Sequence, residues 1–367
     1  MRVGILGGGQ LARMLALAGY PLGLDFTVLE PAQDACAGPL TQHLRAEYTD
    51  AEALQALAGE ADCITYEFEN VPAESVTRLD RQVHVYPPPH ALAAARDRFL
   101  EKTLFNQLEI ETAPFADVQD LDSLRAAVEQ VGLPAVLKTR TLGYDGKGQA
   151  VIREEGELEK AWESIGAVPA ILEGFVEFER EVSLVSVRSR EGEVAFYPLA
   201  RNHHSEGILR RSLSLDGDPA QQLAEQYAQR MLERLDYVGV LAIEFFQIGH
   251  HLLANEMAPR VHNSGHWTIE GAVTSQFENH LRAILGLPLG DTSSTGHAAM
   301  VNLIGELPDT RELLRLPGAH LHLYGKAPRA GRKIGHVTLV EEDRRILQVK
   351  LQRLEELVHG RGGESRS

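Results

Sequence analysis

Strand and helix patterns alternate through the first hundred residues, and this alternation limits the possible folds more than any other feature. An apolar strand at Arg2–Leu6 precedes a helical pattern at Gln10–Ala18, and a second pair follows at Phe26–Leu29 and Ala51–Ala58. Two further strands are expected at Cys63–Phe68 and Val83–Tyr86. Strands that alternate with short helices form a parallel, doubly wound sheet. We therefore predict an amino-terminal α/β domain over residues 1–100.

The rest of the chain is long enough for two more units. Three prolines, Pro87 to Pro89, break the pattern, and one helix is expected at Ala91–Phe105. Residues 101–172 mix helices and strands around a glycine-rich turn, which indicates a small domain. Strands dominate residues 173–358, with one long helix at Ala220–Leu235, and we expect a larger α+β domain there. Residues 359–367 lack apolar periodicity and are predicted to be a disordered tail.

Composition excludes several classes of function. Lys and Arg number 36 and Asp and Glu 52, so the formal net charge of −16 gives no long-range attraction to nucleic acid or an anionic membrane. Cys36 and Cys63 cannot form a disulfide framework, and we expect buried thiols. No apolar run reaches bilayer-spanning length, and the amino terminus lacks a signal-peptide pattern. We expect a cytoplasmic protein that acts on small molecules.

Two glycine-rich turns suggest phosphate binding. The turn Gly7–Ala12 joins a strand to a helix and fits G-x-G-x-x-A, and Glu30 ends the next strand where a ribose-binding acid would lie. The alternative is a tight turn that only packs the helix on the sheet. The second turn, Thr141–Gln149, joins two strands, so it predicts a mobile flap over phosphates, with Lys138 at the end of the strand AVLK. The alternative there is a plain surface hairpin.

A pair of glutamates gives the most informative pattern. If a turn is centred near residue 250, Glu244 and Glu256 face each other across a hairpin. The apolar side chains expected on the same face are Ala242, Phe246, Ile248, Leu252 and Ala254. Two opposed carboxylates on an apolar face are unfavourable unless a divalent cation lies between them, and Mg²⁺ favours such ligands together with nucleotide phosphates. A turn displaced by one residue would instead send the two acids to opposite faces.

Two later segments carry groups suited to anions. Arg260–Trp267 directly follows the glutamate hairpin, and its Arg, Asn and Ser side chains can bind a phosphate or an oxyanion. His266 within it has a structural role as its alternative. The densest basic cluster is Lys326, Arg329, Arg332 and Lys333. This cluster is either an anion site or a solvated loop.

Together these features resemble the ATP-grasp superfamily, which implies an ATP-grasp fold behind an amino-terminal Rossmann-like pre-ATP-grasp domain. Five segments resemble the 5-(carboxyamino)imidazole ribonucleotide synthetase family: GGGQLARM, TYEFENVP, GYDGKGQ, APRVHNSGHWT and GRKIGH, spread over residues 1 to about 340. Ala12 departs from the family's usual GxGQLGRM, where a glycine stands.

The resemblance implies a carbon–nitrogen ligase of purine biosynthesis that uses ATP, Mg²⁺ and bicarbonate to carboxylate the exocyclic amine of aminoimidazole ribonucleotide through carboxyphosphate. We also expect a homodimer, for which the first or third domain could offer an exposed face. The residues implied to act on the reacting groups are Lys138, Arg260, His262 and Asn263. Glu244 and Glu256 are the implied metal ligands.

The remaining roles follow from the same resemblance. Residues implied to bind ATP are Arg98, Lys138, Gly143, Tyr144, Asp145, Gly146, Lys147, Gly148, Gln149, Glu173, Gly174, Phe175, Val176, Glu181, His204, Asn255 and Glu256. Residues implied to bind the ribonucleotide are Gly8, Gln10, Leu11, Asp145, Lys147, Arg260, His262, Asn263, Ser264, Arg332 and Lys333. The adjacent His203 leaves open which histidine faces the nucleotide.

Three other functions remain open at this point. Another ATP-grasp ligase, such as a formate-dependent glycinamide ribonucleotide transformylase or a biotin-dependent carboxylase subunit, would keep Lys138, Glu244 and Glu256 but should lack TYEFENVP and RVHNSGHWT. An NAD-dependent oxidoreductase would use the first glycine turn but leaves the paired glutamates unexplained. A non-catalytic, nucleotide-binding relative should have lost some of the charged residues that this chain retains.

Overall fold

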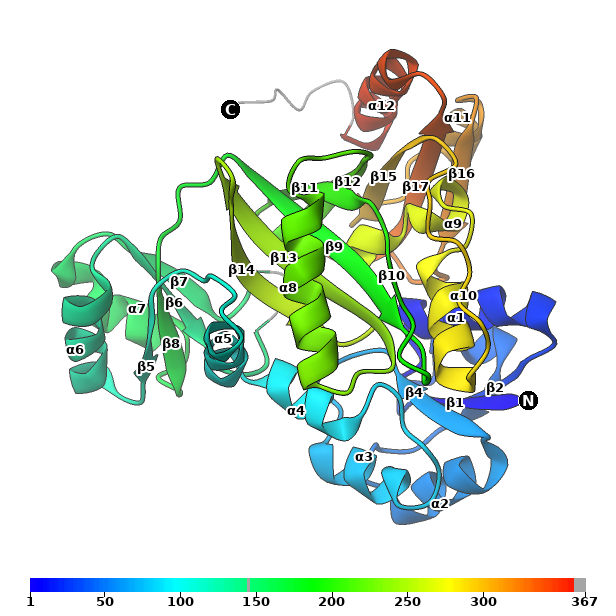
Figure 1. The fold of residues 1–367 in the computed structure, drawn as a ribbon, viewed down its shortest axis with the longest axis horizontal. Helices are drawn as coiled ribbons and strands as arrows, with labels where there is room; N and C mark the ends of the chain where they lie inside the picture. The colour runs from blue at the N-terminus through cyan, green and yellow to red at the C-terminus, as the bar shows by residue number, and fades with distance from the viewer. Residues whose placement is uncertain (144–145, 360–367) are drawn as a thin grey trace.

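The computed structural model describes residues 1–143 and 146–359, and within them the strands form three sheets (Figure 1). The amino-terminal sheet has the order β3-β2-β1-β4, with all neighbours parallel. Its strands are β1 (Arg2–Leu6), β2 (Asp25–Leu29), β3 (Gln42–Leu44) and β4 (Cys63–Tyr66), and its helices are α1 (Gln10–Gly19), α2 (Ala51–Glu60) and α3 (Ala73–Asp80). This parallel α/β domain matches the prediction from alternation.

The strand predicted at Val83–Tyr86 is wrong. Val85 makes only an isolated parallel bridge to Ile64, and its N–H donates to the Asp80 carboxylate at 3.0 Å instead of extending a ladder. Proline follows at position 87 and lacks the N–H that a continuing strand needs. The fourth strand is the short β3, which the alternation did not reveal.

The single helix expected at Ala91–Phe105 is also wrong, because two helices occupy this region. α4 (Pro89–Arg96) and α5 (Arg98–Gln107) are separated by Asp97, whose backbone is extended. The Asp97 carboxylate accepts the N–H groups of Phe99 and Leu100 at 2.9 and 3.2 Å. An aspartate that caps a new helix is strongly favoured at this position, and its local hydrogen bonds end the preceding helix.

A small antiparallel domain follows, with the strand order β5-β8-β6-β7. Its strands are β5 (Phe115–Val118), β6 (Ala135–Thr139), β7 (Gln149–Ile152) and β8 (Ala170–Gly174). α6 (Leu121–Val131) and α7 (Leu158–Ser164) pack on this sheet, as Figure 1 shows, and bury Leu124, Leu137 and Leu172 with it. The β6–β7 hairpin presents the second glycine-rich turn.

The large domain is built on a nine-stranded sheet within the described residues. Its strands are β9 (Arg180–Arg188), β10 (Val194–Phe196), β11 (Leu199–Ser205), β12 (Ile208–Leu215), β13 (Gly239–Ile248), β14 (His251–Ala258), β15 (His297–Ile304), β16 (Ala319–Leu323) and β17 (Lys333–Glu341). Its helices are α8 (Gln221–Arg234), α9 (Thr268–Gly271), α10 (Gln276–Leu285), α11 (Thr310–Leu314) and α12 (Arg344–His359).

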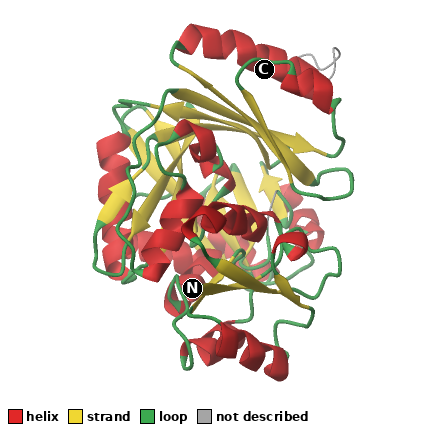
Figure 2. Cartoon of the chain, turned by 90° about the vertical axis from the view of Figure 1, so that its right-hand side faces the viewer, coloured by secondary structure: helices red, strands yellow, loops and turns green. Residues whose placement is uncertain are grey.

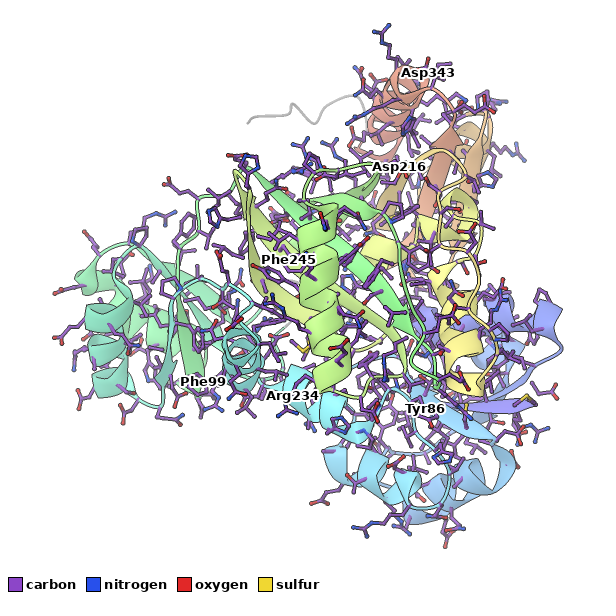
Figure 3. All side chains as sticks on the ribbon, in the orientation of Figure 1. Tyr86, Phe99, Asp216, Arg234, Phe245 and Asp343 are labelled. Carbon is purple, nitrogen blue, oxygen red and sulfur yellow. The ribbon has the colours of Figure 1, made fainter. Side chains whose placement is uncertain are left out.

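Helices cover this sheet in three places. α8 packs on β13, the strand that carries Phe245 (Figure 3). The ring centroids of Tyr227 and Phe245 lie 6.1 Å apart. α10 packs on the sheet and against α1, so one core joins Leu15, Phe26 and Leu281 and fixes the amino-terminal domain to the large domain. α12 lies across β15 and β17 at the carboxyl end (Figure 2).

Helix α12 reaches one residue into the predicted tail. The predicted tail began at residue 359, but His359 still belongs to α12, and residues 360–367 lie outside the described residues. The domain division at residues 100, 172 and 358 stays a prediction. Among the described helices, none combines the length and apolar character needed to cross a membrane.

Candidate active site

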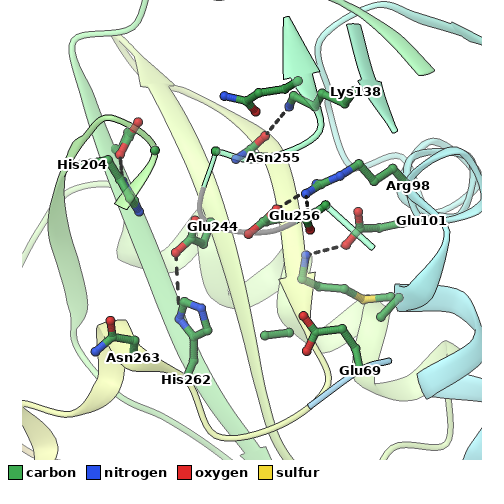
Figure 4. Close-up of a pocket in the computed structure, with 18 of the residues that line it drawn as sticks. Glu69, Arg98, Glu101, Lys138, His204, Glu244, Asn255, Glu256, His262 and Asn263 are labelled. Atoms are coloured by element: carbon green, nitrogen blue, oxygen red, sulfur yellow. Dashed lines mark hydrogen bonds and ion pairs between the residues drawn. The ribbon is translucent and has the colours of Figure 1, made fainter. Parts of the chain in front are cut away.

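All three sheets meet at a cavity of about 700 Å³ (Figure 4). The amino-terminal domain contributes Gln10, Leu11 and Glu67 to its lining, and the small domain contributes Lys138 and Glu173. The large domain contributes Glu181, His204, Glu244, Asn255, Glu256, Arg260, His262, Asn263 and Lys333. Most of the residues proposed from the sequence are therefore brought to one place from distant parts of the chain.

The structure places Glu244 opposite Glu256 across the β13–β14 hairpin, as predicted. The route to this pairing differs from the expected one. Ile248 pairs with His251 around a two-residue turn, and a bulge then makes Asn255 the extra residue between Ala254 and Glu256. The bulge brings Asn255 to the cavity beside Glu256.

The bulge also corrects the predicted apolar face of this hairpin. Leu252 and Ala254 were expected beside Glu244, but they belong to the core on the opposite face, together with Phe245. In the ladder, Ala254 pairs with Phe245 and Leu252 pairs with Gln247. A single inserted residue reverses the facing of every side chain that precedes it on the strand, because side chains alternate with a period of two.

The two glutamates have opposite electrostatic surroundings. Burial raises the pKa of Glu244 to about 7. Burial also raises the pKa of Glu256, but the Arg98 guanidinium, 2.8 Å from its Oε2, outweighs this and leaves the pKa at about 2. A cation placed between them would relieve the burial of a second negative charge at Glu244.

The donor set fits Mg²⁺. Carboxylate oxygens of Glu244 and Glu256 and the amide oxygen of Asn255 are hard ligands that Mg²⁺ accepts, with nucleotide phosphates and water completing the shell. Over residues 1–143 and 146–359, no cluster of three or more His, Cys, Asp or Glu side chains could hold a metal ion by itself. From these residues, the protein itself would offer such an ion two carboxylates and one amide oxygen.

A buried charge network lies on the side of the cavity that the small domain forms. Glu173 Oε2 lies 3.0 Å from Lys138 Nζ and 3.2 Å from Lys102 Nζ. Burial opposes ionisation of Glu173, but the two lysines lower its pKa to about 2. Lys138 also donates to Asn255 Oδ1 at 3.4 Å. The Glu173 side chain thus fixes two lysines, and the N–H groups of Gly174 and Phe175 donate to the Pro114 and Pro134 carbonyls at 2.8 and 3.0 Å.

The second glycine-rich turn, between β6 and β7, lies close to Arg98. Arg98 donates to the Gly143 carbonyl at 3.4 Å, and Gly143, Gly146 and Gln149 line the cavity. Tyr144 and Asp145, both proposed ligand contacts, lie outside the described residues. Other candidates that do not line the cavity are Gly8, Lys147, Gly148, Ser264 and Arg332. Lys147 is exposed, whereas Ser264 is buried behind His262.

The first glycine turn holds carboxylates of the chain itself. Gly8 N–H donates to Glu30 at 3.1 Å, and the N–H groups of Gly9 and Ala12 donate to Glu67. A Cβ on Gly9 would lie 2.5 Å from Glu67 Oε1, so glycine is required for this approach. Glu30 also accepts the Tyr48 hydroxyl at 2.6 Å. Gln10 and Leu11, which follow this turn, are the residues that reach the cavity.

Arg260, His262 and Asn263 form the floor of the cavity. Arg260 Nε donates to Glu69 Oε2 at 2.7 Å, and His262 Nδ1 lies 2.9 Å from Ser264 Oγ. Burial, reinforced by the charge of Arg260, lowers the pKa of His262 to about 3, so this imidazole is neutral. Figure 4 shows His262 directed toward Glu244 and Asn263 beside it.

His266 takes the structural role that was its alternative. It is buried, and its ring centroid lies 5.0 Å from that of His336 and 5.5 Å from that of Phe277.

The basic cluster contains residues that reach the cavity and a residue that is exposed to solvent. Lys333 lines the cavity and Lys326 donates to Gln10 at its edge, whereas Arg329 is exposed.

The two adjacent histidines are separated by the structure. His204 lines the cavity and pairs with Glu181, whereas His203 faces a smaller hollow beside Arg211. Burial lowers the pKa of His204, but the hydrogen bond to Glu181 outweighs it and raises the pKa to about 8. Burial lowers the pKa of His203. Of the two histidines, His204 is therefore the one that faces the main cavity.

Several residues of the site were not identified from the sequence. Glu67 and Glu69 lie in TYEFENVP, which directly follows β4, and side chains after a parallel strand collect at one sheet edge. Their position directly after a parallel strand is the sequence signal that could have identified them. Glu101 Oε1 accepts the Met257 N–H at 2.6 Å, and burial raises the pKa of Glu101 to about 8. Nothing in the local pattern of α5 distinguishes Glu101 or Lys102 from surface residues.

Comparison with known proteins agrees with this geometry. Residues 1–96 match the ribonucleotide synthetase preATP-grasp domain, residues 103–277 the ATP-grasp domain, and residues 298–350 the phosphoribosylaminoimidazole carboxylase C-terminal domain. The chain is 57% identical over 358 residues to the N5-carboxyaminoimidazole ribonucleotide synthase of Pseudomonas aeruginosa, covering 98% of this chain and 99% of the relative.

Solved structures agree as well. The N5-carboxyaminoimidazole ribonucleotide synthetase of Thermus thermophilus superposes with a TM-score of 0.94 at 56% identity, covering 99% of this chain and 100% of the other. The Aspergillus clavatus N5-carboxyaminoimidazole synthase, solved with ADP and 5-aminoimidazole ribonucleotide, has a TM-score of 0.91 at 29% identity and covers 98% of both chains. With matches along nearly its whole length, the chain belongs to the N5-carboxyaminoimidazole ribonucleotide synthase family of ATP-grasp ligases.

Proposed function

We propose that this protein joins bicarbonate to the exocyclic amine of 5-aminoimidazole ribonucleotide at the expense of ATP, in purine biosynthesis. One observation carries the proposal: Gln10 of α1 and Lys333 of β17 face the same cavity as the nucleotide-side residues Lys138, Glu244 and Glu256. A site that had only to bind or hydrolyse ATP would not need these residues from the two ends of the chain.

The nucleotide would lie between the small and large domains. Lys138 and Arg98 place positive charge where the phosphates would lie, and the flap would close over them. Phe175 and Val176 would line the adenine site, with Glu181 and His204 beside the ribose. When bound at Glu244 and Glu256, Mg²⁺ would neutralise charge on the β- and γ-phosphates.

The reaction needs positioning more than a protein nucleophile. A bicarbonate oxygen attacks the γ-phosphorus, ADP leaves, and carboxyphosphate forms. The amine nitrogen then attacks the carboxyl carbon, or CO2 released from it, while phosphate leaves and the amine gives up a proton. Arg260 and Asn263 would hold bicarbonate beside the neutral His262, and the closed cavity would keep water from carboxyphosphate.

The ribonucleotide would lie toward the amino-terminal domain. Gln10, Leu11 and Lys333 line that side of the cavity, and Lys326 is held there by Gln10. Tyr144 and Asp145 of the flap, together with Lys147, stay proposed contacts on the basis of family resemblance alone. Arg332 is half-buried and donates to the Ala327 carbonyl at 3.3 Å, so it would act from the edge of the basic loop.

The test of the reaction is product analysis with labelled bicarbonate. The protein is mixed with ATP, Mg²⁺, 13C-bicarbonate and aminoimidazole ribonucleotide, and carbon NMR is recorded. We expect a new carbamate carbon whose appearance matches ADP formation. ADP without a carbamate carbon would contradict the proposal, and activity with formate and glycinamide ribonucleotide would replace it.

We also propose a cytoplasmic homodimer. Leu17, Tyr20 and Leu22 leave apolar surface exposed on the amino-terminal domain, which supports self-association there. Sedimentation equilibrium should give twice the mass of 40.4 kDa, and a mass of one chain across micromolar concentrations would contradict the dimer.

A further inference from the structure

Behind the floor of the cavity lies a buried amide that no role above includes. Asn302 lies on β15, is 1% exposed and does not line the cavity. Its side chain contacts Asn263, which does line the cavity. A buried amide is costly unless its polar atoms are hydrogen-bonded, and a satisfied buried network rigidifies the groups that it connects.

The two asparagines form a reciprocal pair. Asn302 Nδ2 donates to Asn263 Oδ1 at 2.7 Å, and Asn263 Nδ2 donates to Asn302 Oδ1 at 3.1 Å. The second N–H of Asn302 donates to the Leu209 carbonyl on β12 at 2.9 Å. Three elements, β12, β15 and the Asn263–Gly265 turn, are thereby connected through side-chain amides.

The Leu209 carbonyl determines how both amides are oriented. A carbonyl can only accept, so the Asn302 atom facing it must be the nitrogen. The same nitrogen faces Asn263, which must therefore present its oxygen there and direct its nitrogen to Asn302 Oδ1. The Leu209 carbonyl, a backbone group outside the cavity, thus sets the orientation of the Asn263 amide. The oxygen and the nitrogen of this amide cannot exchange positions without loss of these hydrogen bonds.

The backbone of this turn is fixed by a different residue. Gln276 Oε1 accepts the His262 N–H at 2.9 Å, and Gln276 Nε2 donates to the His262 carbonyl at 2.7 Å. Gln276 is fully buried. Loss of Asn302 should therefore leave the turn in place and release only the Asn263 side chain.

We infer that Asn302 is a positioning residue, which fixes the amide edge that Asn263 offers to bicarbonate and carboxyphosphate. The inference rests on the proposed function of Asn263. Correct hydrogen bonds keep carboxyphosphate beside the amine until transfer is complete, whereas a rotated amide lets it decompose. Misplacement of one such group by about 1 Å can cost 10²-fold in rate.

The experiment is a double-mutant cycle of Asn302→Asp with Asn263→Ala. An aspartate side chain at this position would match asparagine in shape, but its carboxylate could donate neither to Leu209 nor to Asn263. Asn279→Asp is the matched control, because Asn279 is equally buried and donates to Tyr197 and Gly290 away from the cavity. Each variant is assayed for kcat, KM for bicarbonate, ADP affinity and the ratio of ADP to carboxylated product.

Asn302→Asp should lower kcat about tenfold or more and raise the ratio of ADP to product above one, while ADP affinity stays within about twofold. In the Asn263→Ala background it should add no further loss, because its effect passes through Asn263. Asn279→Asp should keep the ratio of the unmodified protein.

Two results would overturn the inference: a normal product ratio in Asn302→Asp, or losses that multiply in the double variant. If thermal unfolding shows that Asn302→Asp is not folded, Asn302→Ser is used in its place. This variant keeps a hydroxyl donor and is judged by the same criteria. Failure of the proposed function is distinguishable, since the unmodified protein would then form no carboxylated product at all.

Discussion

Charge at the facing glutamates determines what the cavity can hold. Glu256 is ionised by its contact with Arg98, whereas Glu244 is buried opposite it and has a raised pKa. Two buried carboxylates that face each other are unfavourable by themselves. The cation proposed between them would offset their repulsion and the cost of their burial.

The first prediction concerns Glu256→Gln. The substitution keeps the shape but removes the charge that would bind metal, so turnover should fall by on the order of 10³-fold while the thermal unfolding curve stays cooperative. Rates are measured over a magnesium titration. Glu179→Gln, an exposed glutamate near the same hairpin, is the control and should keep its activity. Near-normal rates of Glu256→Gln at modest Mg²⁺ would refute the ligand role.

The second prediction concerns the His204–Glu181 pair. The folded-state pKa of His204 is raised to about 8, above its ordinary value of 6.5. Its contribution to stability is therefore fully present below pH 6.5 and is lost as the pH rises through 8. Between pH 7 and 9, the unfolding free energy should fall by on the order of 1 kcal/mol more in the unmodified protein than in His204→Gln.

Urea unfolding at both pH values measures this difference. His203→Gln is the matched control, because burial lowers the pKa of His203 and keeps it neutral over this range. It should behave as the unmodified protein does. An equal pH dependence in His204→Gln would show that the pair is not charged in the folded state.

At the scale of elements, the break between α4 and α5 connects a helix start to the flap. Asp97 caps α5 and also binds Arg140, with Asp97 Oδ2 2.6 Å from Arg140 Nη2. Arg98, the next residue, contacts Glu256 and Gly143. One aspartate therefore fixes both the first turn of α5 and the end of β6.

The third prediction is that Asp97→Ala destabilises the protein and also weakens ATP use. Loss of a helix cap costs about 1 kcal/mol, and loss of the Arg140 pair adds to it. The KM for ATP should rise several-fold, because Arg98 and the flap lose their alignment. Asp120→Ala removes the cap of α6 in the same small domain and should leave the KM unchanged. Equal KM values in both variants would contradict the link to the flap.

Local sequence patterns predicted those elements whose side chains repeat regularly, and failed where a single polar residue overrides the pattern. The parallel strands β1, β2 and β4 and the β13–β14 hairpin followed from apolar periodicity. Asp97 splits an otherwise helical segment, and Asn255 shifts a strand by one residue. Neither event changes the periodicity enough to be predicted, since each is decided by hydrogen bonds formed in the folded chain.

At the scale of the whole molecule, the cavity joins the proposed nucleotide side, built from the middle of the chain, to the proposed ribonucleotide side, which includes Gln10 and Lys333 from near its two ends. The family motifs allowed most cavity residues to be proposed from the sequence. Glu101, Lys102 and Asn302 could not be, because their importance comes from contacts with β8, β14 and the Asn263 turn. Such contacts exist only once the domains have packed.

The fourth prediction uses this separation of the two regions. Lys333→Ala should raise the KM for aminoimidazole ribonucleotide at least about tenfold and change the KM for ATP little, because Lys333 lines the cavity with Gln10 on the proposed ribonucleotide side. Arg329→Ala removes an exposed charge from the same basic loop and should change neither value. Equal increases in both KM values would make the role of Lys333 structural.

The most direct test of the central claim is ADP release with ATP, Mg²⁺ and bicarbonate, measured with and without aminoimidazole ribonucleotide. A carboxylating ligase built on this cavity should release ADP much faster with the ribonucleotide present, and only when bicarbonate is supplied. An equal rate of ADP release with and without the ribonucleotide would contradict the proposed substrate. The assignment of the ATP-grasp fold would not be affected.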